Sequence, residues 1–128
     1  QAEFHKPIRE FVQRVETAVT EADDIDDLLG IMVFGSVARG EADRQSDIDL
    51  FVVIEGDRTS ARRAVTDIVS TLNTERFGGD RYTFEPYVES LESAHRAKSK
   101  LQETFAEART VYNSAEFQSQ RKSVMADE

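Results

Sequence analysis

The sequence predicts an α/β domain in which helices pack against a small mixed sheet. Two short apolar runs, residues 28–35 ("LLGIMVFG") and 47–54 ("DIDLFVVI"), have the length and composition of buried strands. Apolar residues that recur every three or four positions before and after these runs predict helices on either side. The 128 residues suit one domain. Because the chain begins with Gln1 rather than methionine, we expect it to be a fragment of a longer protein.

The N-terminal half is predicted to contain a helix followed by two strands. The helix covers residues 4–22, and its apolar face consists of Phe4, Ile8, Phe11, Val12, Val15, Val19 and Ala22. The acidic stretch 21–27 ("EADDIDD") ends the helix and is interpreted as a solvated loop. Gly35 stops the first strand, and residues 36–42 ("SVARGEA") form a short helix or a turn before the second strand.

The C-terminal half is predicted to contain a helix, a strand and a second helix. Helical spacing at 61–72 predicts a helix that Asp57 or Thr59 caps, and 77–80 ("FGGD") form a turn. The third strand, 81–88 ("RYTFEPYV"), is placed at a sheet edge or a bend because Pro86 cannot donate a hydrogen bond. Residues 91–108 again have helical spacing, and 109–112 ("RTVY") could add a last strand. The residues after Ser114 are left as one more helix or a frayed end.

Composition excludes several classes of function. The absence of cysteine excludes disulfides and thiolate metal sites, and two separated histidines, His5 and His95, argue against a zinc site and are interpreted as surface residues. The net charge of −9 argues against nucleic acid as the partner of this domain. No membrane span or signal peptide is apparent, so we expect a cytoplasmic protein. Only four of the 16 basic residues are lysines, which fits either a halophilic source or an ordinary acidic domain.

Two aspartates at the start of the second strand suggest a metal site. Asp47 and Asp49 share one face of the strand by two-residue alternation, about 7 Å apart along it. Packed beside a core with nothing between them, they would repel each other and one would take up a proton. A divalent cation removes this conflict, and Mg²⁺ typically binds one or two carboxylates together with substrate phosphates.

The turn after the first strand is suited to phosphate. Gly35 lets a phosphate approach the backbone closely, and Ser36 offers a hydroxyl and an N–H at an expected helix start. Gly40 keeps the next turn open. Arg39 and Arg44 flank the turn, either as partners for triphosphate charge or as solvated surface arginines.

These elements together resemble the nucleotidyltransferase superfamily that shares the DNA polymerase β type fold. The segment 35–50 ("GSVARGEADRQSDIDL") is similar to that of the minimal nucleotidyltransferase (MNT-type) group, and the resemblance covers about residues 4–112. It implies transfer of a nucleoside monophosphate from a triphosphate, with AMP from ATP as the expected case, and loss of pyrophosphate. By similarity, Gly35 and Ser36 would hold the β- and γ-phosphates, with Arg39 and Gly40 beside them. Asp47 and Asp49 would hold Mg²⁺ (or Mn²⁺).

The resemblance also implies a third carboxylate on a later strand, which completes a second metal site or takes the proton from the acceptor. Glu85 is the candidate and Glu89 the reserve, and the alternative for Glu85 is an outward-facing strand acid. A glutamate followed by proline departs from the usual aspartate, which bears on the two-metal mechanism and on catalytic competence. Tyr82, Tyr87 and Tyr112 are interpreted as packing residues, and the alternative for Tyr87 is a role near an adenine or at an interface.

The sequence is compatible with two main functions of different class. The first is an enzyme that adenylylates an acceptor, because MNT proteins often act as antitoxins that transfer AMP to a tyrosine of an all-helical HEPN-type ribonuclease. The second is a binding module that neutralises such a partner by occlusion, with a vestigial or nucleotide-sensing site. Transfer to a small molecule is a third possibility, for which 128 residues leave little room.

Overall fold

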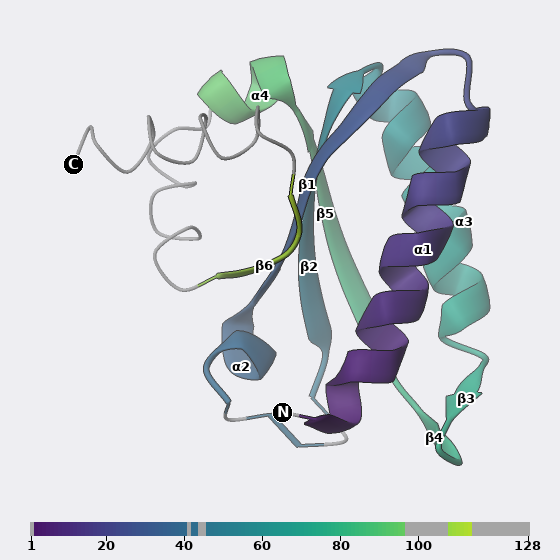
Figure 1. Cartoon of the computed structure of the whole chain (residues 1–128), viewed down its shortest axis with the longest axis vertical. Helices are drawn as coiled ribbons and strands as arrows, with labels where there is room; N and C mark the ends of the chain where they lie inside the picture. The colour runs from purple at the N-terminus through teal and green to yellow at the C-terminus, as the bar shows by residue number, and fades with distance from the viewer. Residues whose placement is uncertain (1, 41, 44–45, 97–107, 114–128) are drawn as a thin grey trace.

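The computed structural model describes residues 2–40, 42–43, 46–96 and 108–113 (Figure 1). After the 3-10 helix η1 (Ala2–Phe4), the helices are α1 (His5–Glu21), α2 (Gly35–Ala38), α3 (Arg58–Leu72) and α4 (Leu91–Arg96). The strands are β1 (Ile25–Phe34), β2 (Ile48–Gly56), β3 (Arg76–Phe77), β4 (Asp80–Arg81), β5 (Phe84–Ser90) and β6 (Arg109–Asn113).

The main sheet is small and mixed, as the sequence predicts. Its strand order is β5-β2-β1-β6. Strand β1 pairs antiparallel with β2 and with β6, whereas β2 pairs parallel with β5. The strand that contains Pro86 is therefore at an edge of the sheet, where a missing N–H costs least. The predicted Gly-Gly turn joins β3 and β4 into a separate hairpin, with positive φ at Gly78 and Gly79.

Helices α1 and α3 cover one face of the sheet, as Figure 1 shows. The alternation predicted for the second strand is confirmed, because Ile48, Leu50, Val52 and Ile54 lie in the core cluster beneath these helices. Phe51 and Val53 belong to a second cluster on the opposite face, together with Leu29, Met32 and Ala108. The strand is buried on both sides, so its first residues are held rigidly at the end of the sheet.

The predicted loop after the first helix is partly wrong. Strand β1 already begins at Ile25, inside the acidic stretch, and Ile25 pairs with Gly56. Ile25 is buried whereas Asp26 and Asp27 are exposed, so the strand forms without burying a carboxylate. Irregular pairing between Ile25 and Asp27 accommodates the two consecutive acids.

Three further boundaries differ from the prediction. Asp47 immediately precedes β2 rather than starting it, and the third strand begins at Phe84 because residues 80–81 belong to the hairpin. Ala108 is not helical, but it is buried in the second core cluster. The predicted helix is described only as far as Arg96, and residues 97–107 and those after Asn113 lie outside the described residues.

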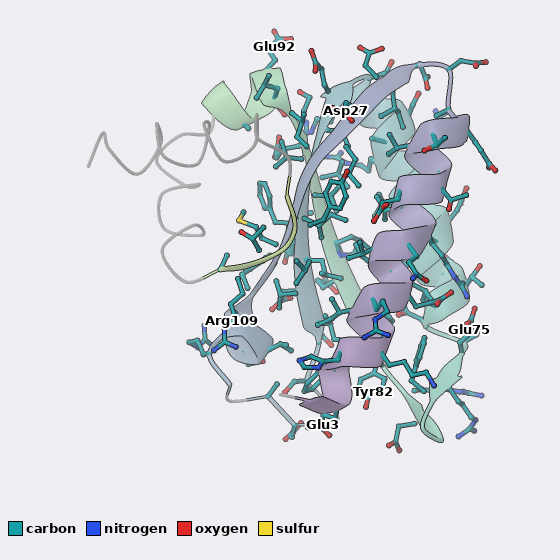
Figure 2. The ribbon with its side chains drawn as sticks, viewed as in Figure 1. Glu3, Asp27, Glu75, Tyr82, Glu92 and Arg109 are labelled. Atoms are coloured by element: carbon teal, nitrogen blue, oxygen red, sulfur yellow. The ribbon has the colours of Figure 1, made fainter. Side chains whose placement is uncertain are left out.

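Specific contacts fix the ends of the elements. Asp57 caps α3, since its carboxylate accepts a hydrogen bond from the Ser60 N–H at 3.1 Å. Tyr82 is buried as predicted, and its hydroxyl donates to the Glu3 carbonyl at 3.3 Å, so both residues lie at the same end of the molecule (Figure 2). No helix in the described part of the chain is long and apolar enough to cross a membrane.

Candidate active site

Three segments meet at one end of the sheet. Strand β1 ends there and continues into α2, while β2 and β5 begin there (Figure 1). Register pairing places Asp49 opposite Phe34 on β1 and opposite Glu85 on β5. Paired residues of neighbouring strands point to the same face of a sheet, so the carboxylates of Asp49 and Glu85 project side by side.

The carboxylates of Asp47, Asp49 and Glu85 influence one another electrostatically. Asp47 and Glu85 are exposed, whereas Asp49 is half-buried. Burial raises the pKa of Asp49, and the charges of Asp47 and Glu85 raise it further, against the opposing effect of Arg39. The site therefore concentrates negative charge around a carboxylate that is partly removed from water, which is the arrangement that a bound cation relieves.

Gly35 is in contact with this carboxylate. Its φ of +68° lies in the left-handed region, and a Cβ at this position would collide with Oδ2 of Asp49 and come within 3.3 Å of its Cγ. Glycine is thus favoured here both by the backbone conformation and by the close packing of Asp49. The Gly-Ser turn and Asp49, which are separate in the sequence, therefore lie directly against each other.

The other residues of the turn are placed as follows. Ser36 is half-buried in the first turn of α2, and Arg39 is exposed at the end of this helix, where its charge acts on Asp49. Gly40 has a φ of +74° with open space around it. Arg44 lies outside the described residues.

Tyr87 packs as predicted and also lies close to the candidate site. Its side chain is 43% exposed, and its ring packs against that of Phe34 with the centroids 5.3 Å apart. Burial and the charges of Asp49, Glu85 and Asp47 all raise its pKa, so its hydroxyl lies within electrostatic range of the three carboxylates. The available sequence signal was alternation, because a residue two positions after Glu85 must share its face of β5.

Glu85 and Glu89 have different surroundings. Glu85 is exposed and lies beside Asp49. Because its carboxylate stays in water, its burial gives no argument for a functional role. Glu89 lies four residues further along β5, about 13 Å away at the strand rise. It contacts Arg58 at 3.3 Å and Ser93 at 2.5 Å. Glu89 is therefore a structural partner of these two residues, and of the two glutamates only Glu85 lies beside the aspartates.

The donor set of the site is open rather than closed. No group of three His, Cys, Asp or Glu side chains within the described residues is already arranged around a single metal position. An open set suits Mg²⁺, which takes one or two carboxylates and completes its shell with phosphates and water. Two carboxylates would suffice for Mg²⁺ if a phosphorylated ligand and water supplied the other donors.

The fold is similar to those of several proteins of known structure. A toxin–antitoxin structure with AMP-PNP is similar over 95% of this chain and 86% of the other, with 19% identity and a TM-score of 0.56. The complex of a tri-AMPylated HEPN toxin with an MNT antitoxin from Shewanella oneidensis matches 91% of this chain and 85% of the other, with 15% identity and a TM-score of 0.54.

Spectinomycin adenyltransferase AAD(9) from Enterococcus faecialis, solved with ATP and spectinomycin, matches 90% of this chain and 58% of its own. Its identity is 10% and its TM-score is 0.58. At these identities the likeness concerns the fold. No curated protein sequence matches the chain.

The family follows from the sequence itself. Residues 12–126 match the model of the nucleotidyltransferase domain, so the chain belongs to the nucleotidyltransferase domain family. This confirms the superfamily resemblance drawn from residues 35–50. It supports nucleotidyl transfer as the chemistry, and such transferases generally use a nucleoside triphosphate and a divalent metal.

Proposed function

We propose that this protein transfers AMP from ATP to a hydroxyl group of an acceptor. The observation that carries the proposal is the close packing of Gly35 against Asp49, on a sheet face that also presents Glu85. This packing places a turn suited to phosphate directly beside carboxylates suited to a cation. The arrangement accommodates a triphosphate and a metal as one unit, in a chain of the nucleotidyltransferase family.

The residues present fit a divalent metal. Asp47 and Asp49 would hold Mg²⁺ (or Mn²⁺), with Glu85 as the third acid, since these carboxylates otherwise oppose one another's charge. When bound, the metal supplies charge neutralisation at the phosphates and at the displaced pyrophosphate. Asp49 is the least exposed of the three acids, and it gains most from a cation because burial disfavours its ionised form.

The chain's own residues have distinct tasks in this proposal. Gly35 allows the phosphate chain to approach the backbone, Ser36 donates to the β- and γ-phosphates, and Gly40 keeps the turn open beside them. Arg39, exposed near Asp49, balances triphosphate charge once the nucleotide is bound. Glu85 accepts the proton of the attacking hydroxyl, because it is solvent-accessible and next to Asp49 across the strand pair.

For the acceptor we propose a protein, in particular a HEPN-type toxin partner. Support comes from the similarity of the chain to proteins in toxin–antitoxin complexes, including one whose HEPN toxin is AMPylated. The net charge of −9 suits association with a basic, RNA-cleaving partner. The alternative is that the domain neutralises such a partner by occlusion without transferring a nucleotide.

Radiolabel transfer from α-labelled ATP to a co-purified partner tests this function. Asp47→Asn and Asp49→Asn should lower transfer at least a hundredfold, and Glu85→Gln should lower it on the order of a hundredfold while nucleotide binding persists. Asp67→Asn, which changes an exposed acid of α3, serves as the matched control. Partner binding with no label transfer by the unmodified protein would favour occlusion instead.

A further inference from the structure

The start of β5 is held from both sides, although this strand is at an edge of the sheet. On the inner side, the Ile48 N–H donates to the carbonyl of Thr83, which directly precedes β5, at 2.8 Å. Backbone groups of successive residues in a strand point to opposite sides, so the N–H of Phe84 points away from β2. Among the described residues, no further strand lies on that side to accept its hydrogen bond.

Asn73 supplies the acceptor that a further strand would otherwise provide. Its side-chain oxygen accepts a hydrogen bond from the Phe84 N–H at 2.9 Å, in a partly buried contact. Asn73 directly follows α3, and its own N–H donates to the Val69 carbonyl at 2.9 Å, so the helix fixes its backbone. A partly buried N–H that lost this acceptor would be left without a hydrogen bond, which is unfavourable.

The buried ring of Phe84 determines where the next side chain points. The ring is 2% exposed and stacks on that of Phe11 in α1, with the centroids 6.0 Å apart. Because successive side chains of a strand point to opposite faces, Glu85 projects from the other face, beside its register partner Asp49. Since the Glu85 side chain is exposed, its position depends on the backbone at the start of β5.

We propose that Asn73 is a positioning residue for Glu85. Its side-chain oxygen holds the start of β5 in place, so that the Glu85 carboxylate stays beside Asp49, where it accepts the proton of the attacking hydroxyl. When this hydrogen bond is removed, the start of the edge strand opens more often, because only β2 holds it there. The inference rests on the proposed function, which assigns the proton to Glu85.

Amide hydrogen exchange, followed by NMR on the metal-free protein, tests the structural part. Asn73→Ala should speed exchange of the Phe84 and Glu85 amides at least tenfold, whereas Asn73→Asp should not, because a carboxylate oxygen can accept the same hydrogen bond. Arg58→Ala is the matched control. It removes another contact from α3 to the β5 backbone, the 3.1 Å hydrogen bond to the Val88 carbonyl, and should leave exchange at the strand start unchanged.

Radiolabel transfer from α-labelled ATP to the co-purified partner tests the functional part. Asn73→Ala should lower the rate at saturating ATP about tenfold, with Mg²⁺-dependent binding of an ATP analogue unchanged. Asn73→Asp should restore most of the rate, and Arg58→Ala should match the unmodified protein. Adding Asn73→Ala to Glu85→Gln should lower the rate no further, since both changes act through the same carboxylate.

The positioning role and the proposed function fail in different ways. Equal effects of Asn73→Ala and Arg58→Ala, on exchange or on transfer, would overturn the positioning role, as would a further loss in the double variant. If Glu85→Gln lowers transfer and Asn73→Ala does not, the positioning role alone is wrong. If the unmodified protein transfers no label, or Glu85→Gln leaves transfer unchanged, the proposed function has failed, and the positioning role with it.

Discussion

Replacing Gly35 with alanine tests how the phosphate turn and Asp49 depend on each other. The new Cβ would overlap with Oδ2 of Asp49, which is the free end of a side chain and can turn away. We therefore expect the fold to survive and the carboxylate to move. Magnesium-dependent nucleotide affinity should fall at least tenfold, which is about 1.4 kcal/mol.

The cost in stability has two parts. Alanine at a left-handed φ costs roughly 1–2 kcal/mol, and the loss of freedom in the unfolded chain offsets about 0.4–1 kcal/mol of it. Displacing the Asp49 side chain adds about 0.5–1.5 kcal/mol. Gly78→Ala is the matched control, because Gly78 has a φ of +63° against +68° at Gly35 and no atom within 4 Å of its Cβ position.

Urea unfolding and binding of a fluorescent ATP analogue measure the two effects on both variants. Both should lose on the order of 1 kcal/mol of unfolding free energy, with the larger loss for Gly35→Ala, and only Gly35→Ala should lose nucleotide affinity. In the Asp49→Ala background, Gly35→Ala should cost only as much stability as Gly78→Ala. Unchanged nucleotide affinity in Gly35→Ala would show that the turn and the aspartate act independently, against the single site inferred from their contact.

Three further predictions concern charge and capping. Without divalent metal, Asp49→Asn should raise the free energy of unfolding at neutral pH, because the raised pKa means that ionised Asp49 destabilises the fold; urea titrations should show this gain shrinking as pH falls through the raised pKa. Asp57→Ala should cost about 1 kcal/mol by losing the α3 cap, whereas Thr59→Ala should cost nothing measurable; equal losses in thermal unfolding would contradict this assignment. The melting temperature should rise between low salt and molar KCl as self-repulsion at net charge −9 is screened, and a constant value would remove the support for a halophilic source.

The spacing of apolar residues along the sequence predicted the helices and strands well, because the buried face of each element must be apolar. The two-sided burial of β2 appears in the sequence as an uninterrupted apolar run. Pro86 predicted a sheet edge or a bend for its strand, and β5 is at the edge of the sheet. The start of β1 was missed since two exposed aspartates follow Ile25, and local charge suggested a loop. Pairing of Ile25 with Gly56, a residue far along the chain, decides this strand end.

The residues of the candidate site could be chosen from short sequence motifs, but their arrangement in space could not. Asp49, Gly35 and Glu85 were chosen from their sequence context, but their contact depends on the register of β2 against β1 and β5. The same register pairs Glu89 with Val53, away from the aspartates, and Glu89 forms an ion pair with Arg58. The position of Tyr87 on the face of Glu85 follows from alternation along β5, whereas its ring contact with Phe34 depends on how the strands are arranged in the sheet and could not be predicted.

Calorimetric titration with a non-hydrolysable ATP analogue, with and without Mg²⁺, shows whether Asp47 and Asp49 bind a metal together with the nucleotide. We predict binding that requires Mg²⁺ in the unmodified protein and is lost in the Asp47→Asn, Asp49→Asn double variant, whose fold is checked by circular dichroism. Equal binding by the folded double variant, or no binding by the unmodified protein under either condition, would contradict the assignment of these aspartates to a metal–nucleotide site.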